Sequence, residues 1–192
     1  MRSIPYVEWT TRRDRALNQI ARAHAAVGGK GRGRRYATEQ INHAYAVLVA
    51  SQFQGFCRDL HSECARYLAA AINIPDLREI VRAELVWNRQ LDRGNATPAS
   101  IGSDFGRLGI DFWIEVDAYD PSCVRRRNLL TELNAWRNAV AHQDFNPAHL
   151  AGTVTLRLSA VQLWRRACNG LAGAFDEVMR RHLQTVTGAS PW

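Results

Sequence analysis

The sequence predicts an all-α protein, an antiparallel bundle of about five helices. Apolar residues recur at spacings of three and four over long stretches, which is the pattern of amphipathic helices. Glycine and proline gather between these stretches, where they end helices. Apolar residues make up 46% of the 192-residue chain, enough to form one core. We therefore expect a single domain over residues 1–192, with a basic N-terminal part (1–36) and a bundle core (37–185).

The first helix is expected over residues 7–26, where Leu17, Ile20 and His24 recur at helical spacing. A segment rich in glycine and arginine follows at residues 28–35, and glycines at this density cannot hold a helix. The segment lacks the Ser or Thr that completes a phosphate-binding P-loop. We therefore expect a flexible basic loop here.

Two further helices are expected over residues 38–72 and 76–91, separated by Pro75. The longer one keeps helical spacing of its apolar residues throughout: Ile41, Tyr45, Leu48, Phe53, Phe56, Leu60, Cys64, Tyr67, Leu68 and Ala71. In the shorter one, the residues expected to face the core are Leu77, Ile80, Val81 and Leu85, with Trp87 as a further candidate. Residues 94–119 contain a proline and several glycines and are expected to form a mixed connection.

The fourth helix is expected to start at Asp120, a good N-cap followed by Pro121, and to run to about His142. A fifth is expected from Ser159, because Gln162 three residues later completes a capping box. Its inward residues are expected to be Val161, Trp164, Cys168, Leu171, Phe175, Val178 and Met179. Two i,i+4 ion pairs are expected on its outer side, Asp176–Arg180 and Glu177–Arg181.

Cysteine usage indicates a cytoplasmic protein. The four cysteines form no Cys-x-x-Cys pair and are expected to be buried free thiols: Cys57, Cys64, Cys123 and Cys168. The longest stretch without Asp, Glu, Lys or Arg, residues 40–57, carries several amide and hydroxyl side chains, so no membrane span is predicted. None of the histidines stands at the spacing from acidic residues or cysteines that a metal site requires. The sequence therefore predicts no metal site and no cofactor.

The net charge of +7 comes entirely from the N-terminal part, since residues 1–36 contain nine basic and two acidic residues. Such an asymmetry suits phosphates or an acidic partner. The candidate RNA contacts lie in the glycine-rich segment and near the start of the fourth helix, where the helix dipole disfavours cations: Arg32, Arg34, Arg35, Arg125, Arg126 and Arg127. A solvated helix face or a general preference for arginine explains the same charges equally well.

The most informative residues stand near the end of the fourth helix. Its apolar stripe is Leu129, Leu133, Trp136 and Val140, and Arg137 lies at the edge of that stripe. A guanidinium there requires a carboxylate, a path to water, or a cleft. Asn138 and His142 are four residues apart and share a face, so both can line the same cleft.

These three side chains suit phosphoryl transfer on RNA. The planar fork of arginine binds phosphate oxygens and stabilises charge that grows on phosphorus. Histidine side chains titrate near neutrality and can take a proton from a ribose 2′-hydroxyl or protonate the leaving oxygen. Three alternatives stay open: Arg137 pairs with Asp59 or Glu63, His142 only caps its helix, and Trp136 belongs to the core instead of stacking on a base.

Residues 137–142 resemble the signature of HEPN domains, in which an arginine, usually followed by a polar residue, precedes a histidine by four to six intervening residues. Residues 53–61 also resemble the long second helix of bacterial HEPN proteins. The resemblance implies a helical bundle that dimerises so that two motifs meet in one cleft. It further implies a metal-independent endoribonuclease of the kind found in toxin–antitoxin and phage-defence systems.

The sequence thus leads to the hypothesis of a homodimeric endoribonuclease, a toxin or phage-defence effector. In this hypothesis His142 is the general base or acid, Arg137 stabilises the transition state, and Asn138 orients the substrate. RNA is the expected substrate, and an antitoxin or other regulatory protein is a possible partner. The alternative is a non-catalytic HEPN-like module that binds RNA or a protein through the same cleft. A DNA-binding regulator is less well supported, because no helix-turn-helix spacing is present.

Overall fold

The computed structural model describes residues 1–28 and 36–192, and regular secondary structure in these residues is helical, without a strand. The predicted all-helical bundle is confirmed, whereas the predicted count of about five helices is too low. In chain order the elements are α1 (Ile4–Glu8), a π-helical turn η1 (Trp9–Arg13), α2 (Asp14–Gly28), α3 (Tyr36–Ala70), α4 (Pro75–Val86), α5 (Gln90–Arg93), α6 (Pro98–Gly106), α7 (Phe112–Tyr119), α8 (Cys123–His142), a 3₁₀ turn η2 (Pro147–His149) and α9 (Leu158–Thr187).

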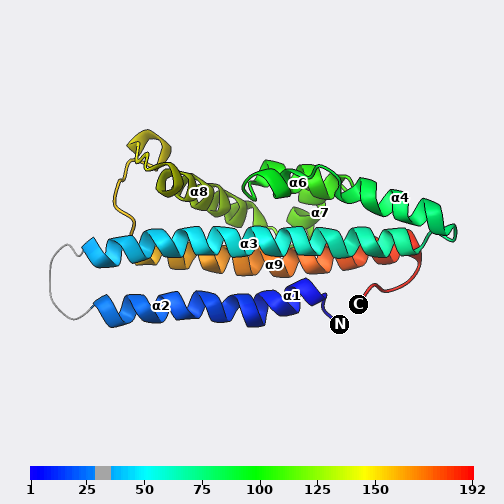
Figure 1. Cartoon of the computed structure of the whole chain (residues 1–192), viewed down its shortest axis with the longest axis horizontal. Coiled ribbons are helices and arrows are strands. Elements are labelled where there is room, and N and C mark those ends of the chain that lie inside the picture. The colour runs from blue at the N-terminus through cyan, green and yellow to red at the C-terminus, as the bar shows by residue number, and fades with distance from the viewer. Residues whose placement is uncertain (29–35) are drawn as a thin grey trace.

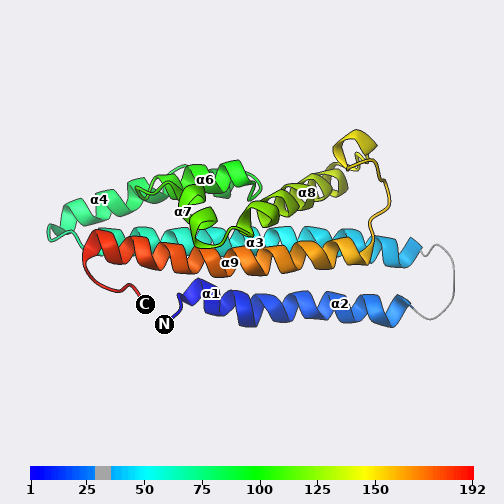
Figure 2. The ribbon, with the colours of Figure 1, turned by 180° about the vertical axis from the view of Figure 1, so that it is seen from behind.

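The helices form three layers, and the long pair α3 and α9 is the middle layer (Figure 1). Helices α1 and α2 cover one side of this pair, and α4 to α8 cover the other (Figure 2). The bundle is antiparallel only in part. α3 and α9 run in the same direction, while α2, α4 and α8 run against them. The two longest helices can be parallel because the chain returns along the upper layer before α9 begins.

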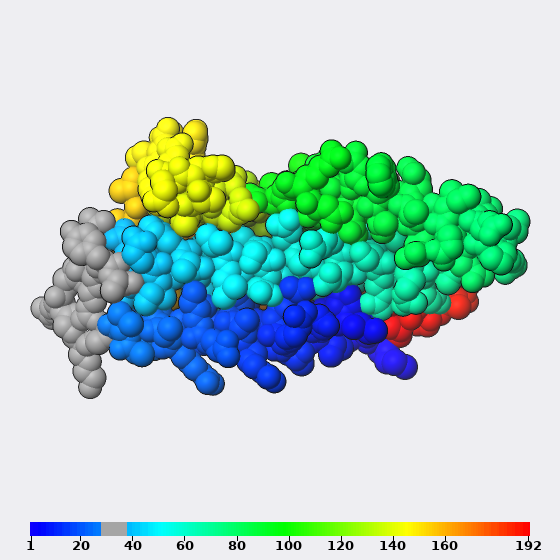
Figure 3. All heavy atoms as spheres, viewed as in Figure 1, coloured from blue at the N-terminus to red at the C-terminus, as the bar shows by residue number. Residues whose placement is uncertain are grey.

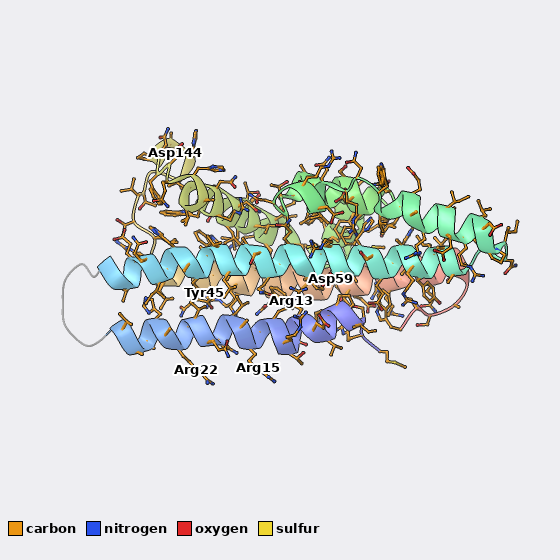
Figure 4. All side chains as sticks on the ribbon, viewed as in Figure 1. Arg13, Arg15, Arg22, Tyr45, Asp59 and Asp144 are labelled. Atoms are coloured by element: carbon orange, nitrogen blue, oxygen red, sulfur yellow. The ribbon has the colours of Figure 1, made fainter. Side chains whose placement is uncertain are left out.

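The N-terminal helices are held to the central pair by partly buried polar contacts. Arg13 donates to the Asp59 carboxylate at 2.5 Å and to Gln52 at 2.9 Å, and its guanidinium lies over Gly55, where a β-carbon would collide with it (Figure 4). At the start of α2, Asp14 forms an ion pair with Arg165 of α9. The helix predicted over residues 7–26 therefore begins earlier, at residue 4, and packs as a third long rod.

An aromatic cluster forms the centre of the core. Phe105, Phe112 and Phe175 pack against one another with ring centroids 4.3 to 6.2 Å apart. Phe53 and Trp9 extend the cluster towards the N-terminal layer. The aromatic residues of this cluster come from all three layers and hold them together. Burial of each large apolar side chain contributes about 1.5–3 kcal/mol to stability. The inward residues predicted for the last helix are all buried, as predicted.

The third predicted helix is wrong in its extent and in its inward face. α4 ends at Val86, and a separate short helix, α5, follows. No residue of α4 is buried, and Leu77 and Ile80 are 43% and 65% exposed. The helix contacts the core only through its last turn, where Leu85 and Val86 are partly buried. Sequence periodicity located an apolar face but could not show that this face lies at the edge of the bundle.

Residues 94–119, predicted as a mixed connection, contain α6 and α7. α6 begins because the Thr97 hydroxyl accepts from the backbone N–H of Ser100 at 3.1 Å, next to a proline in the first turn. Its residue Asp104 is buried and accepts from the backbone N–H groups of Gln90 and Leu91 at 3.0 and 2.8 Å. This carboxylate therefore caps α5 from a neighbouring helix.

A buried histidine connects α3 to the same region. His61 is fully buried; its Nε2 lies 2.9 Å from the backbone carbonyl of Asp104 and its Nδ1 lies 3.2 Å from Nη1 of Arg89. Since guanidinium groups only donate, Nδ1 accepts and Nε2 carries the proton. Burial and the nearby Arg89 lower the pKa of His61 to about 4. His61 is thus a neutral link that joins α3, α5 and α6.

The helix starts predicted after residue 119 need small corrections. α8 begins at Cys123, three residues after Asp120, whose carboxylate accepts from the Ser122 backbone at 3.0 Å in a preceding turn. α9 begins at Leu158, and the predicted capping box at Ser159 is not formed. The predicted Asp176–Arg180 pair is also absent. The Asp176 carboxylate is buried and binds Ser3 and Arg2, while Glu177 pairs with Arg180 and Arg181.

The four cysteines are free and buried, as predicted. Burial raises the pKa values of the Cys57 and Cys64 thiols well above their usual range. Within the described part of the chain, no helix is long and apolar enough to cross a membrane.

Candidate functional site

The predicted motif lies in the last two turns of α8. Arg137 is partly buried, whereas Asn138 and His142 are exposed. The helix ends immediately after His142, because Gln143 adopts a left-handed conformation with φ of 54°. In the space-filling view, the end of α8 and the segment after it stand as a lobe beside α4 to α6 (Figure 3). In one chain the motif is therefore on an open surface.

The Asn138 side chain is fixed by two donors. Asn95, in the turn between α5 and α6, donates from Nδ2 to Oδ1 of Asn138 at 2.6 Å. Arg137 donates from Nη1 to the same oxygen at 3.3 Å. Because a guanidinium has no acceptor, the atom facing it must be the amide oxygen, and the Asn138 Nδ2 group points away from it. The amide N–H groups of Asn138 thus remain available to a ligand.

Arg137 carries a charge that no carboxylate neutralises among the described residues. The two acids proposed as partners are used elsewhere, since Asp59 pairs with Arg13 and Glu63 lies beside the backbone of Ile4. The predicted pairing of Arg137 with either acid is therefore wrong. Its contact with Asn138 directs the guanidinium towards the exposed side of α8.

His142 is equally free of partners in the described structure. His142 makes no capping hydrogen bond among the described residues, since Gln143 uses carbonyls at the end of α8: its backbone N–H bonds Ala139 and its side chain bonds Val140 at 2.7 Å. His142 still lies in the last turn of α8, where a charged imidazole complements the helix dipole, so this alternative stays open. At 100° per residue, His142 lies about 40° from Asn138 but about 140° from Arg137 on the helix. The imidazole and the amide therefore share a face, and the guanidinium reaches that face only through its long side chain.

Trp136 belongs to the core, which is one of the alternatives that the sequence left open. It is 4% exposed, and its ring packs near His43, Phe145 and Trp164. This packing fixes the rotation of α8 about its axis. The exposed positions of Asn138 and His142 follow from that rotation.

The predicted RNA-contacting arginines differ in their surroundings. Arg32, Arg34 and Arg35 lie outside the described residues. Arg126 forms an ion pair with Asp120, and Arg127 pairs with Asp117 at 2.8 Å and lies 4.9 Å from the Trp113 ring. Arg125 is exposed and has no carboxylate partner among the described residues. Two of these three arginines thus hold α8 to its surroundings, and one is free at the surface.

Asn95 is the site residue that the sequence did not reveal. It lies 43 positions before Asn138, in a turn whose neighbouring helices were not predicted. The adjacent Ala96 carbonyl accepts from Asn134 of α8 at 3.0 Å. The connection between α5 and α6 therefore contacts two residues of α8, Asn134 and Asn138, that are one helical turn apart. A lone asparagine before a Thr-Pro pair gives no sequence signal of such a contact.

The arrangement offers a free cation, an oriented amide and an exposed imidazole on one stretch of helix. Among the described residues, no group of three or more His, Cys, Asp or Glu side chains is placed to hold a metal ion. Comparison of the chain with models of protein families, with curated proteins and with solved structures gives no match.

Proposed function

We propose that the protein is a metal-independent endoribonuclease of the HEPN type, which cuts single-stranded RNA at a site built on α8. The observation that carries this proposal is the un-neutralised Arg137, hydrogen-bonded to Asn138 beside the exposed His142. Two arginines that hold the fold together, Arg13 and Arg127, have carboxylate partners, whereas Arg137 has none among the described residues. A free guanidinium near the same helix end as an exposed imidazole instead suits a phosphate.

In the proposed reaction the ribose 2′-oxygen attacks the adjacent phosphorus. The bond from O2′ to phosphorus forms, the bond from phosphorus to O5′ breaks, and the products are a 2′,3′-cyclic phosphate and a 5′-hydroxyl. His142 takes the 2′-hydroxyl proton, and a second acid gives a proton to O5′. Arg137 and the Asn138 N–H groups bind the phosphate oxygens as negative charge grows.

One motif supplies one histidine, whereas this reaction needs a base and an acid. We therefore propose a two-fold dimer in which two α8 helices face each other and each contributes one His142. The open position of the motif in a single chain supports this arrangement, because a second chain would close the surface into a cleft. We further propose that the enzyme is a cytoplasmic toxin or phage-defence effector, controlled by an antitoxin or another regulatory protein.

A chimeric oligonucleotide tests the activity sharply. DNA with one ribonucleotide at a defined position should be cut only after that ribonucleotide, in excess EDTA, and the upstream product should end in a cyclic phosphate. The matched all-DNA oligonucleotide should stay intact. Cleavage of both, or cleavage that requires a divalent cation, would exclude the proposed reaction.

A non-catalytic RNA- or partner-binding module is the second candidate. It is favoured by the angular separation of Arg137 and His142 on α8, which leaves them apart within one chain. Under this alternative the chimeric oligonucleotide binds, and the binding depends on Arg137, but it stays uncut.

A further inference from the structure

A groove lies on the side of α8 opposite to Asn138 and His142. It is bounded by the extended segment 153–157 and the first turns of α9, has a volume of about 630 Å³, and reaches Trp136 of α8. Leu156 and Leu163 form further apolar parts of its floor. Its size is that of sites that accept a nucleotide-sized ligand.

Two arginines line this groove, Arg157 just before α9 and Arg166 two turns into it. Both are exposed, and neither has a carboxylate partner among the described residues. They are nine positions apart in the sequence, which is about 13 Å along the helix. Three residues with hydroxyl groups, Thr153, Thr155 and Ser159, also line the groove.

The sign of the charge distinguishes this groove from the other pockets described. Four further pockets each include at least one carboxylate, as Asp111 and Glu115 do in the pocket beside Arg181. The groove beside Trp136 contains no acidic residue. The N-terminus of α9 adds the positive end of a helix dipole to this field, and no acidic residue in the first turn of the helix offsets it.

The walls of the groove are held by the core. Asn42 of α3 is 6% exposed and donates from Nδ2 to the backbone carbonyl of Leu156 at 2.9 Å. Trp136 is fixed among His43, Phe145 and Trp164. The extended segment and the floor therefore keep a fixed distance, as a preformed binding site requires.

We propose that this groove binds single-stranded RNA on the other side of α8 from the site of cleavage. Its cations would contact phosphates, its hydroxyl groups would contact riboses, and its apolar floor would receive a base. Trp136 lies about 200° around α8 from Asn138, so a helix about 10 Å thick separates the groove from the motif. The groove thus binds the flanking strand and not the scissile phosphate. This inference rests on the proposed function, because it takes RNA as the ligand.

The test measures binding without cleavage. A short fluorescein-labelled oligouridine is titrated with the His142→Ala protein in EDTA, and anisotropy gives Kd at several salt concentrations. Adding Arg157→Gln and Arg166→Gln should weaken binding about tenfold or more and reduce the slope of log K against log salt by about 1.4. The matched control, Arg15→Gln with Arg22→Gln, removes the same charge from the outer face of α2 (Figure 4) and should change Kd less than about twofold.

A second variant separates binding from folding. Ser159→Glu places a carboxylate in the groove and also in the first turn of α9, where the helix dipole favours it. This protein should melt no lower than its parent and still bind the oligouridine several-fold more weakly. Equal weakening by the α2 control, or competition by polyglutamate as effective as competition by RNA, would overturn the groove as an RNA site.

Failure of the groove and failure of the nuclease give different results. If the protein with His142 intact binds RNA through Arg157 and Arg166 but cuts nothing, the groove stands and the proposed activity is wrong. If it cuts RNA while the groove variants bind and cut like the parent, the activity stands and the groove is wrong.

Discussion

Asn95 Nδ2 donates to Asn138 Oδ1 at 2.6 Å, and this contact orients the amide at the centre of the candidate site. Arg137 donates to the same oxygen, so the turn after α5 and the last turns of α8 act on one acceptor. Loss of Asn95 would leave Asn138 held by Arg137 alone. The turn after α5 is therefore part of the site, although it lies outside the motif.

The first prediction follows from this contact. Asn95→Ala should lower the RNA cleavage rate about three- to tenfold, the value of one neutral hydrogen bond. Asn95→Asp should lower the cleavage rate further, because the new carboxylate would pair with Arg137 and repel Oδ1 of Asn138. Single-turnover cleavage measures both, and Asn73→Ala, at an exposed position between α3 and α4, is the control. Equal rates for the wild type and Asn95→Asp would show that the amide orientation has no role.

The second prediction concerns pH and the buried His61. Its pKa is about 4 in the folded protein against 6.5 for an ordinary histidine, so the unfolded chain binds a proton that the folded chain does not between these values. Stability is therefore lost as pH falls, and the free energy of unfolding should be about 2 kcal/mol lower at pH 5 than at pH 7. Urea unfolding at both pH values measures it.

His61→Gln should reduce this difference, because the titrating group is gone, while it lowers stability at pH 7. His149→Gln is the control, since His149 is exposed on η2. If the His61→Gln protein keeps the full pH difference, the histidine is not its source.

The third prediction compares two aspartates near helix N-termini. Asp104→Ala leaves the backbone N–H groups of Gln90 and Leu91 without acceptors and should lower the free energy of unfolding by about 3 kcal/mol. Asp111→Ala should change it by less than about 0.5 kcal/mol, because Asp111 is exposed and makes no side-chain cap at α7. Similar losses for the two variants would contradict the capping role of Asp104.

The fourth prediction concerns assembly. Light scattering at micromolar concentration should give twice the chain mass of 21.6 kDa. Thr131→Arg, on the same exposed face of α8 as Asn138 and His142, should favour the monomer, because two copies would bring the added cations together. Thr185→Arg, exposed on α9, should leave the mass unchanged. A monomeric wild-type protein would remove the second histidine that the proposed reaction needs.

Sequence periodicity predicted the long helices well, because α3, α8 and α9 bury continuous apolar stripes. It failed for α6 and α7, which are short and depend on contacts with distant residues, such as the packing of Phe105 and Phe112 against Phe175 of α9. The exposed face of α4 was misassigned for a related reason: periodicity identifies an apolar face but not what lies against it.

The candidate site was predictable in part. Spacing on one helix placed Asn138 and His142 on a common face, and the structure agrees that both are exposed. Spacing could not show that Arg137 has no carboxylate partner, because this depends on Asp59 and Glu63 contacting the N-terminal layer, on the other side of the central pair from α8. The contribution of Asn95 depends on a turn that no local pattern indicated.

The most direct test of the central claim is single-turnover cleavage of labelled single-stranded RNA in excess EDTA, comparing the wild type with His142→Ala. We predict a 2′,3′-cyclic phosphate product from the wild type and a rate at least about 100-fold lower for His142→Ala, with unchanged helical signal and RNA binding. Arg137→Lys should also be slow, since a point charge lacks the planar fork, and His149→Ala should cut normally. If His142→Ala cuts RNA as fast as the wild type, α8 is not the catalytic site.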